Sequence, residues 1–531
     1  MRRRQRGDCG RAFKTYGPEG KKLSILLALL LFLEAAPGCA LGQSASAALG
    51  GIVPGGLSAS QRVVYASTIA GATGGQAVTP GNSAIGDTDS AAALNAVLAA
   101  GNTKLILDSG YALSKSLVLY SGDTLECVSR MDGVIMMVNS NATPVINAHQ
   151  NPPTVASGTG GYLVSNQTDQ HIAIRHCTLN ANSTQAVTGN NVLGTPHAVN
   201  PATGLFVYGA EMVGVEDLMF DDDDVYDTGA FVTLFANDSH VSLTRNFFHQ
   251  PAPVVAKKNT DGPHFVGPDR YIYEVGNTIV AGDDSLPFNA DDGNRTGSGD
   301  PNAPYVANFV KWGWITDVFV DNNSIDGSSF GLRLYSATEL LDRIEISNTS
   351  GIVCGNTAEL AKVGPHNLGN GNIGTIRIDG WQVTTTGACN SYSQHYNFVI
   401  TSNYTSLQIN GLQITNPGAN WPVITHNVVA PGILSLRNWD ISTPSSSAFS
   451  VVSFTGGSAP QVAASGMQWL DNSNNTGTFF AGTVVPSVLT CSNYSGPDRL
   501  LASGFAPVVK NGDCFTNSYP LRRDLPKPGI Q

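Results

Sequence analysis

The sequence is poor in charge, and the charges it has lean acidic. Of its 531 residues only 13% are charged, with 40 acidic and 29 basic side chains, and 42% are hydrophobic. A disordered acidic tail and a coiled coil need far more charge, and a nucleic-acid binder needs an excess of basic residues. The composition therefore excludes these three classes, and we expect no nucleic-acid partner.

Several motifs and long apolar runs are also missing. The sequence has no Gly-rich phosphate-binding loop, no nucleophilic serine motif and no C-x-x-C pair. These are the usual signatures of nucleotide binding, serine hydrolysis and structural zinc. No segment approaches the ~18 consecutive apolar residues of a membrane span. We therefore expect no cofactor, no bound metal and no membrane span.

The first 42 residues have the pattern of an export signal. Residues 1–42 hold eight basic and three acidic residues, the largely apolar run Leu23 to Leu33, and the small-residue run Ala40-Leu41-Gly42. This pattern predicts a secretory signal peptide and an extracellular or periplasmic protein; lipidation at Cys39 is the alternative. Its removal leaves 21 basic and 37 acidic residues, so the net charge changes from −11 to −16.

A leader and one short helix follow. Residues 43–85 are dominated by Ala, Gly, Ser and Thr, which predicts a flexible leader or a loosely packed strand. Asp87 to Ser90 offer N-cap chemistry, and Ala91 to Ala100 place apolar residues at helical spacing before Gly101. We expect a helix over 89–100.

Beyond the helix, an apolar-x-apolar motif recurs with a long period. It begins at Ile172, Val213, Val241, Tyr273, Val318, Ile344, Ile376, Leu407 and Leu434, and six of the eight intervals lie between 26 and 32 residues. Two-residue alternation with Asn and Gly turns at this period is typical of a β-solenoid, whereas the alternative, an antiparallel sandwich, shows turn signals every 8–12 residues. The pattern predicts an all-β parallel β-helix over 86–445, capped by the helix, with C-terminal coils and a cap over 446–531.

This fold makes further predictions about the cysteines and the loops. Six cysteines follow the signal segment, and six allow fifteen pairings; sequence neighbours on a solenoid are spatial neighbours, which favours 127–177, 354–389 and 491–514. The two long intervals place extra chain at 185–212 and 284–310. Long loops on a regular scaffold are where binding tends to sit. If they block one end of a groove, we expect exo action.

Acidic residues gather where the second long loop begins. Asp261 and Asp283 are 22 residues apart, close to one coil, and Asp284 follows directly. Residues one coil apart stack at ~4.8 Å, so the three carboxylates could face one groove. Carboxylates this close separate into an acid and a base, which glycoside hydrolysis requires. The alternative is that they are turn residues or members of an Asn/Asp ladder.

Three ordered motifs carry a resemblance to a known family. They are Asn259-Thr260-Asp261-Gly262-Pro263-His264, Gly282-Asp283-Asp284 and Gly331-Leu332-Arg333-Leu334-Tyr335. They resemble the N-T-D-G-x-H, G-D-D and R-I-K motifs of glycoside hydrolase family 28, the polygalacturonases and their relatives, and Gly86 to Leu113 resembles the cap of pectate-lyase-like β-helices. The resemblance implies a right-handed parallel β-helix and inverting hydrolysis. It implies Asp283 as general acid, Asp261 and Asp284 activating water, and Arg333 contacting the sugar.

The sequence also departs from that family. Ser285 stands where many members have Cys, Lys311-Trp312-Gly313-Trp314 stands where the family has Gly-His-Gly, and Tyr335 replaces the lysine that holds a uronate carboxylate. These departures and the acidic charge favour a neutral or weakly charged glycan, although local basic residues such as Lys257, Lys311 and Arg333 could overturn that preference. The candidate substrate-binding residues are His264, Asn259, Asn289, Asp291, Lys311, Trp312, Arg333 and Tyr335.

Two other functions stay open from the sequence. A calcium-dependent polysaccharide lyase could use Asp221 to Asp224 as ligands and Lys257, Lys258 or Arg333 as base. Consecutive strand residues alternate faces, however, so four aspartates in a row are more typical of an acidic turn. The second is a non-catalytic β-helix that binds carbohydrate at a surface. In each case we expect a monomer whose partner is a polysaccharide or oligosaccharide.

Overall fold

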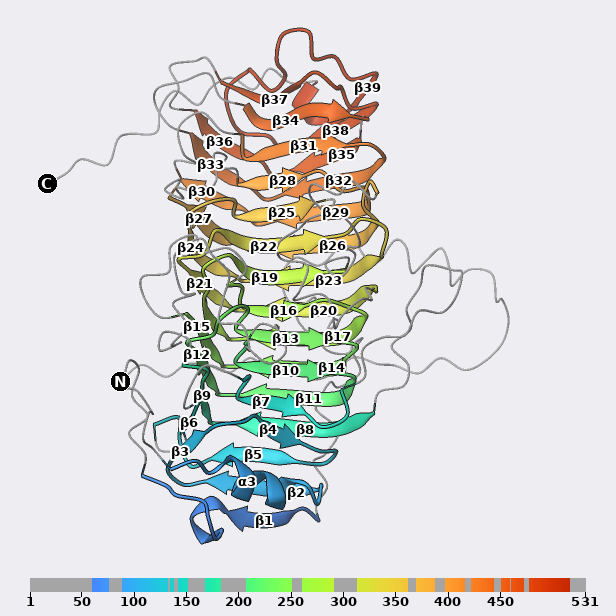
Figure 1. Cartoon of the computed structure of the whole chain (residues 1–531). Helices are drawn as coiled ribbons and strands as arrows, with labels where there is room; N and C mark the ends of the chain where they lie inside the picture. The colour runs from blue at the N-terminus through green and yellow to red at the C-terminus, as the bar shows by residue number, and fades with distance from the viewer. Residues whose placement is uncertain are drawn as a thin grey trace, which may run out of the picture. The chain divides into compact units, whose positions relative to one another are not determined.

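The structure is a computed structural model, and it describes fourteen segments of the chain. They are residues 60–75, 88–131, 134–137, 142–150, 168–182, 207–250, 260–290, 313–361, 369–386, 397–415, 422–443, 450–458, 460–471 and 477–515. These segments fold into a right-handed parallel β-helix, and all pairings between their strands are parallel. Figure 1 shows the coils stacked from the N-terminal strands to the C-terminal ones. The predicted fold class is confirmed.

The described strands form four sheets. Sheet A contains β1 (Arg62–Tyr65), β2 (Thr103–Leu107), β5 (Thr124–Cys127), β8 (Asp169–Arg175), β11 (Val215–Asp221), β14 (Ser239–Thr244), β17 (Asp269–Val275), β20 (Ile315–Asp321), β23 (Leu341–Ser347), β26 (Ile373–Asp379), β29 (Tyr404–Asn410), β32 (Pro431–Arg437), β35 (Gln461–Ser465), β38 (Val488–Ser492) and β39 (Val509–Asn511). Sheet B contains β3 (Gly110–Leu113), β6 (Val134–Met137), β9 (Thr178–Asn180), β12 (Asp224–Tyr226), β15 (Phe247–His249), β18 (Thr278–Val280), β21 (Ser324–Asp326), β24 (Ser350–Val353) and β27 (Gln382–Thr385).

The other two sheets complete the coils. Sheet C contains β4 (Leu117–Leu119), β7 (Val145–Asn147), β10 (Ala210–Val213), β13 (Thr233–Ala236), β16 (Pro263–Phe265), β19 (Asp284–Asn289), β22 (Phe330–Tyr335), β25 (Ala358–Ala361), β28 (Phe398–Ile400), β31 (Ile424–Val428), β34 (Ser450–Gly457) and β37 (Thr478–Gly482). Sheet D contains β30 (Gln413–Thr415), β33 (Asp440–Thr443) and β36 (Gln468–Asp471). From β10 to β27, each coil passes through sheets C, A and B in turn.

Apolar columns inside the solenoid hold the coils together. One column on sheet A pairs residue with residue through Ile172, Leu218, Val241, Ile272, Val318, Ile344, Ile376, Leu407 and Leu434. All nine are at most 2% exposed. A fully buried Leu or Ile side chain stabilises a fold by about 1.5–3 kcal/mol, so these repeated columns supply much of the stability.

Seven of the nine predicted motifs begin in this column, and two do not. The motif predicted at Val213 spans the end of β10 and the start of β11, and the residue of that coil that lies in the column is Leu218. On β17 the inward residues are Ile272 and Glu274, so the motif predicted at Tyr273 is one residue out of register. The error arose because a carboxylic acid occupies an interior position, which breaks the apolar alternation.

The two ends of the solenoid contain a short helix and additional strands. The helix α3 (Ala91–Leu98) packs against β2 and β4 and buries Ala91, Leu94 and Leu98 in the core. It lies within the predicted 89–100. β1 lies in the segment predicted as a leader or loosely packed strand, and it pairs with β2. Beyond residue 445, sheet A continues to β39 and sheet C to β37. The short helices η2 (Ala66–Thr68) and η4 (Asp513–Phe515) lie near the two ends.

Membrane spans are absent from the described helices. None is long and apolar enough to cross a bilayer.

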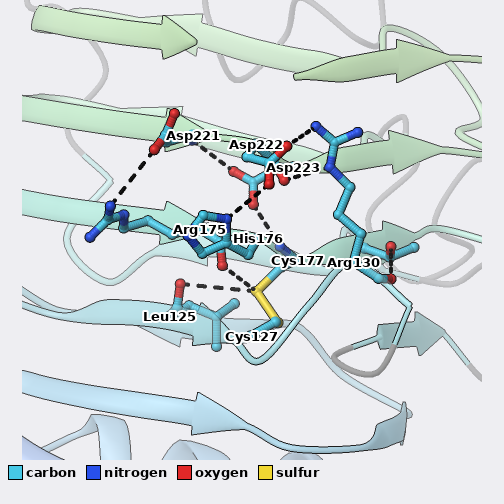
Figure 2. The surroundings of a disulfide bond; sticks show 10 residues. Leu125, Cys127, Arg130, Arg175, His176, Cys177, Asp221, Asp222 and Asp223 are labelled. Atoms are coloured by element: carbon cyan, nitrogen blue, oxygen red, sulfur yellow. Dashed lines mark hydrogen bonds and ion pairs between the residues drawn. A yellow bond between two sulfur atoms is a disulfide. The ribbon is translucent and has the colours of Figure 1, made fainter. Parts of the chain in front are cut away.

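Disulfides join neighbouring coils. Cys127 pairs with Cys177 (Figure 2) and Cys491 with Cys514, which confirms two predicted pairings. Cys354 is also disulfide-bonded. Its predicted partner Cys389 lies outside the described residues, so the third pairing stays a prediction.

Candidate active site

Three buried carboxyl groups meet at the start of two neighbouring strands of sheet C. Asp261 lies just before β16, Asp283 just before β19, and Asp284 is the first residue of β19. Carboxylate oxygens from all three lie within 4.8 Å of one another, and the residues are only 3%, 5% and 2% exposed. The structure therefore brings together the three predicted catalytic residues.

The pairing of the coils explains why they meet. The amide of Gly262 donates to the carbonyl of Asp284 at 2.8 Å, so Asp261 lies directly beside Asp284 on the next coil. A Cβ on Gly262 would lie 2.5 Å from the carbonyl oxygen of Ser285, so only glycine permits this close approach. The register partner of Asp261 is thus Asp284, one residue beyond the position suggested by the 22-residue interval.

A buried histidine, His264, forms a hydrogen bond with Asp261. Its Oδ2 lies 2.7 Å from Nδ1 of His264, and its Oδ1 accepts from the amide of Asp284 at 3.4 Å. The imidazole stacks on the ring of Phe231, with centroids 3.8 Å apart, and its Nε2 lies 3.4 Å from Nδ2 of Asn289. An amide nitrogen can only donate, so His264 accepts at Nε2 and donates from Nδ1 to Asp261.

Asp284 is held instead by a guanidinium. Nη1 of Arg333 lies 3.1 Å and 3.2 Å from the two oxygens of Asp284, and Nε lies 3.5 Å from Oε2 of Glu359. The guanidinium carbon lies 4.0 Å from the ring centre of Tyr335 and 4.5 Å from that of Phe330. Two carboxylates and two aromatic rings therefore set the position of Arg333.

Burial and the Arg333 guanidinium shift the pKa of Asp284 in opposite directions. Burial raises the pKa of Asp284 well above its usual range, and Arg333 lowers it. The neighbouring carboxylates of Asp261, Asp283 and Glu359 raise the pKa of Asp284 further. Like charges this close disfavour one another's ionisation, so the cluster holds a proton more readily than isolated carboxyl groups do. It can therefore offer an acid and a base at the same place.

A second apolar cluster, separate from the interior core, borders the site on its N-terminal side. It comprises Tyr208, Val213, Ala230, Phe231, Leu234, Ala236 and Val266, all at most 5% exposed. Phe231 connects this cluster to the site through its stack on His264. On the C-terminal side, the side chains of Arg333 and Glu359 are each 17% exposed. The two sides of the site therefore differ in polarity and exposure.

Some of the other predicted site residues lie beside the carboxylates, and the rest lie outside the described residues. Tyr335 on β22 is in register with Asn289 on β19, so both residues lie on coils beside the carboxylates. The predicted residues Asn259, Asp291, Lys311 and Trp312 lie outside the described residues.

Sequence reasoning missed Phe231, Phe330 and Glu359. The register shows that Glu359 lies one coil beyond Arg333. The interval of 26 residues between them, close to the repeat period, was the available signal.

The acidic run Asp221 to Asp224 does not form one ligand set. Figure 2 shows Asp221, Asp222 and Asp223 directed to different neighbours. The contacts are Arg245 and Thr244 for Asp221, His176 and Arg130 for Asp222, the amides of Cys177 and Asp221 for Asp223, and His249 for Asp224. These contacts remove the geometric basis of the predicted calcium alternative.

Asp223 belongs instead to a ladder of side chains that cap backbone amides. The backbone amide of Asp223 donates to the side-chain oxygen of Asn246 at 2.9 Å. In the same way, the backbone amide of Asn246 donates to the side chain of Asn277 at 2.8 Å, and that of Asn277 to the side chain of Asn323 at 2.7 Å. The ladder interpretation considered for the acidic residues therefore applies to Asp223. Asp261 and Asp284 instead receive His264 and Arg333 as partners.

No protein-family model matches the sequence. No curated protein matches it either. Solved structures align over most of the chain at low identity. The family 28 exopolygalacturonase of Yersinia enterocolitica is 11% identical over 85% of this chain and 78% of that chain, with a TM-score of 0.37. The endo-xylogalacturonan hydrolase of Aspergillus tubingensis is 12% identical over 85% and 99%, with a TM-score of 0.39. The N-terminal fragment of gene product 12 of bacteriophage Phi29 is 11% identical over 85% and 71%, with a TM-score of 0.46.

Proposed function

We propose that the protein is a glycoside hydrolase that cleaves a polysaccharide or oligosaccharide. The observation that carries the proposal is the cluster of Asp261, Asp283 and Asp284, with carboxylate oxygens within 4.8 Å of one another. Glycosidic bond hydrolysis needs one protonated and one ionised carboxyl group beside the scissile bond. A buried cluster of three carboxyl groups with one bound guanidinium supplies both forms.

The roles follow from the partners of each carboxylate and from the family 28 resemblance. Asp283 donates its proton to the glycosidic oxygen as the bond to the leaving sugar breaks. Asp261 and Asp284 bind the water whose oxygen bonds to the anomeric carbon, and one of the two carboxylates accepts the proton that this water loses. Burial raises the pKa of Asp284, which makes its carboxylate a stronger proton acceptor, while Arg333 lowers that pKa and so favours the ionised form.

We further propose that the reaction inverts the anomeric configuration. Carboxyl groups as close as these are more typical of retaining enzymes, in which one of them attacks the sugar directly. Here, however, both oxygens of Asp284 are bound by Arg333, and those of Asp261 by His264 and a backbone amide. Such carboxylates are better placed to orient water than to attack. Proton NMR of the first product will show inverted configuration; retention would contradict the mechanism.

Replacement of the proposed acid tests the function directly. We expect Asp283→Asn to reduce glycan hydrolysis by about 10²–10⁴-fold, the usual contribution of general acid–base catalysis, while the unfolding midpoint stays unchanged. Asp326→Asn, which removes an exposed carboxylate on β21, is the matched control. Full activity in Asp283→Asn would remove Asp283 from the mechanism. If a broad glycan panel gives no cleavage, the non-catalytic carbohydrate-binding alternative takes its place.

We also propose that the protein acts outside the cytoplasm as a monomer. Two disulfides between neighbouring coils fit an oxidising compartment. The basic and apolar N-terminal segment supplies the export signal.

A further inference from the structure

We propose that Glu359 makes the active site selective for neutral sugars, because it holds Arg333 jointly with Asp284. This inference rests on the proposed hydrolase function and names its substrate class. Arg333 and Glu359 are in register on β22 and β25. Glu359 thus lies one coil further from the acidic cluster than Arg333, on the partly exposed side of the site.

The guanidinium of Arg333 is already engaged by the protein's own carboxylates. Its Nη1 contacts both oxygens of Asp284, and its Nε faces Glu359 at 3.5 Å. Arginine recognises a carboxylate through a planar fork of N–H donors. A uronate would have to displace one of these two carboxylates from the fork, and that carboxylate would then be left beside the substrate without its cation.

The charge around Arg333 also disfavours a uronate. Asp261, Asp283, Asp284 and Glu359 are four acidic groups around one described guanidinium, and Glu359 adds to the charges that act on Asp284. Two of these groups, Asp284 and Glu359, contact the guanidinium itself. A substrate carboxylate that approaches Arg333 is therefore repelled by both of them, whereas a hydroxyl group can donate a hydrogen bond to a carboxylate.

One further observation fits neutral sugars. The ring of Tyr335 packs on the guanidinium of Arg333 at 4.0 Å, so an uncharged ring covers one face of the cation.

The decisive variant is Glu359→Gln, which removes the charge and keeps the shape. Kinetics on neutral polysaccharides (glucans, galactans, xylans and mannans) and on polygalacturonate will show that the wild type prefers a neutral substrate by at least 100-fold in kcat/KM. Glu359→Gln will reduce this preference at least 10-fold, chiefly through a lower KM for polygalacturonate. Glu345→Gln, which removes a carboxylate paired with Arg377 on sheet A, will leave the preference unchanged.

A preference of the wild type for polygalacturonate, or an unchanged preference in Glu359→Gln, would overturn the inference. Calorimetric binding of neutral and uronate oligosaccharides to the same proteins separates this failure from that of the proposed function. If no glycan is cleaved but binding is selective and shifts in Glu359→Gln, the hydrolase proposal alone fails. If neither binding nor cleavage distinguishes the two sugar classes, the role of Glu359 is wrong.

Discussion

Asp261 and Asp284 lie side by side, yet each has a different kind of partner. His264 donates to Asp261 and stacks on Phe231, whereas Arg333 binds Asp284 and contacts the ring of Phe330. His264 is fully buried behind Asp261, which places it as a positioning residue. A hydrogen-bond donor orients a carboxylate, and a cation beside a carboxylate favours its ionised form. The pair therefore divides two tasks between two residue types.

The role of His264 can be tested with two amide substitutions. The nitrogen of Asn reproduces the position of Nδ1, which contacts Asp261, whereas the longer Gln reproduces Nε2, which faces Asn289. We expect His264→Asn to retain most of kcat and His264→Gln to lose about 10-fold or more, since a misplaced catalytic group alone can cost ~10²-fold. Steady-state kinetics will show the loss in kcat and not in KM.

A purely structural role for His264 predicts the opposite order. Gln fills the buried space better than Asn, so it would then be the milder change. Equal kcat values in the two variants would contradict the positioning role, and unfolding midpoints will exclude a difference in folding.

At the scale of the strand, β17 carries an acid where its neighbours carry apolar residues. Glu274 pairs in register with Leu243 and Val320, is fully buried, and its two carboxylate oxygens have no hydrogen-bond partner in the described segments. Burial raises the pKa of Glu274 from 4.5 to about 8. The strand is therefore most stable when this side chain is neutral.

The pKa of Glu274 makes folding depend on pH in a defined direction. Between pH 4.5 and about 8 the folded protein keeps this proton and the unfolded chain loses it. The free energy of unfolding therefore falls by about 1.4 kcal/mol for each pH unit of rise in that window. We expect Glu274→Gln to abolish this contribution, which urea unfolding at pH 5 and pH 8 will measure. Glu216→Gln on β11 is the control, and an unchanged pH slope in Glu274→Gln would refute the prediction.

The strands also show how far sequence reasoning reaches. Apolar alternation placed seven motifs in the sheet A column, and the coil period brought Asp261, Asp283 and Asp284 together. It could not give the register, because neighbouring coils differ in length: Leu218 follows Ile172 by 46 residues and Val241 follows Leu218 by 23. Contacts such as Arg333 with Glu359 depend on register and on side-chain direction. Motif spacing alone does not determine either.

At the scale of the whole molecule, the two sides of the site predict the mode of action. The seven-residue apolar cluster containing Phe231 is buried on the N-terminal side, and Arg333 and Glu359 are partly exposed on the other. If this buried cluster closes the N-terminal side of the site, a polymer can place only its end at the carboxylates. We expect exo action: short products from the first minutes and a slow fall in viscosity. A rapid loss of viscosity with few new reducing ends would show endo action.

The disulfides affect how the solenoid unfolds. In a solenoid each coil contacts only its neighbours, so unfolding can begin at a terminal coil and proceed from coil to coil toward the centre. Cys491–Cys514 ties β38 to the chain around η4, and Cys127–Cys177 ties the coil of β5 to that of β8. Both lie toward the ends of the stack, away from the carboxylates. They oppose the unfolding of the catalytic coils from either end of the chain.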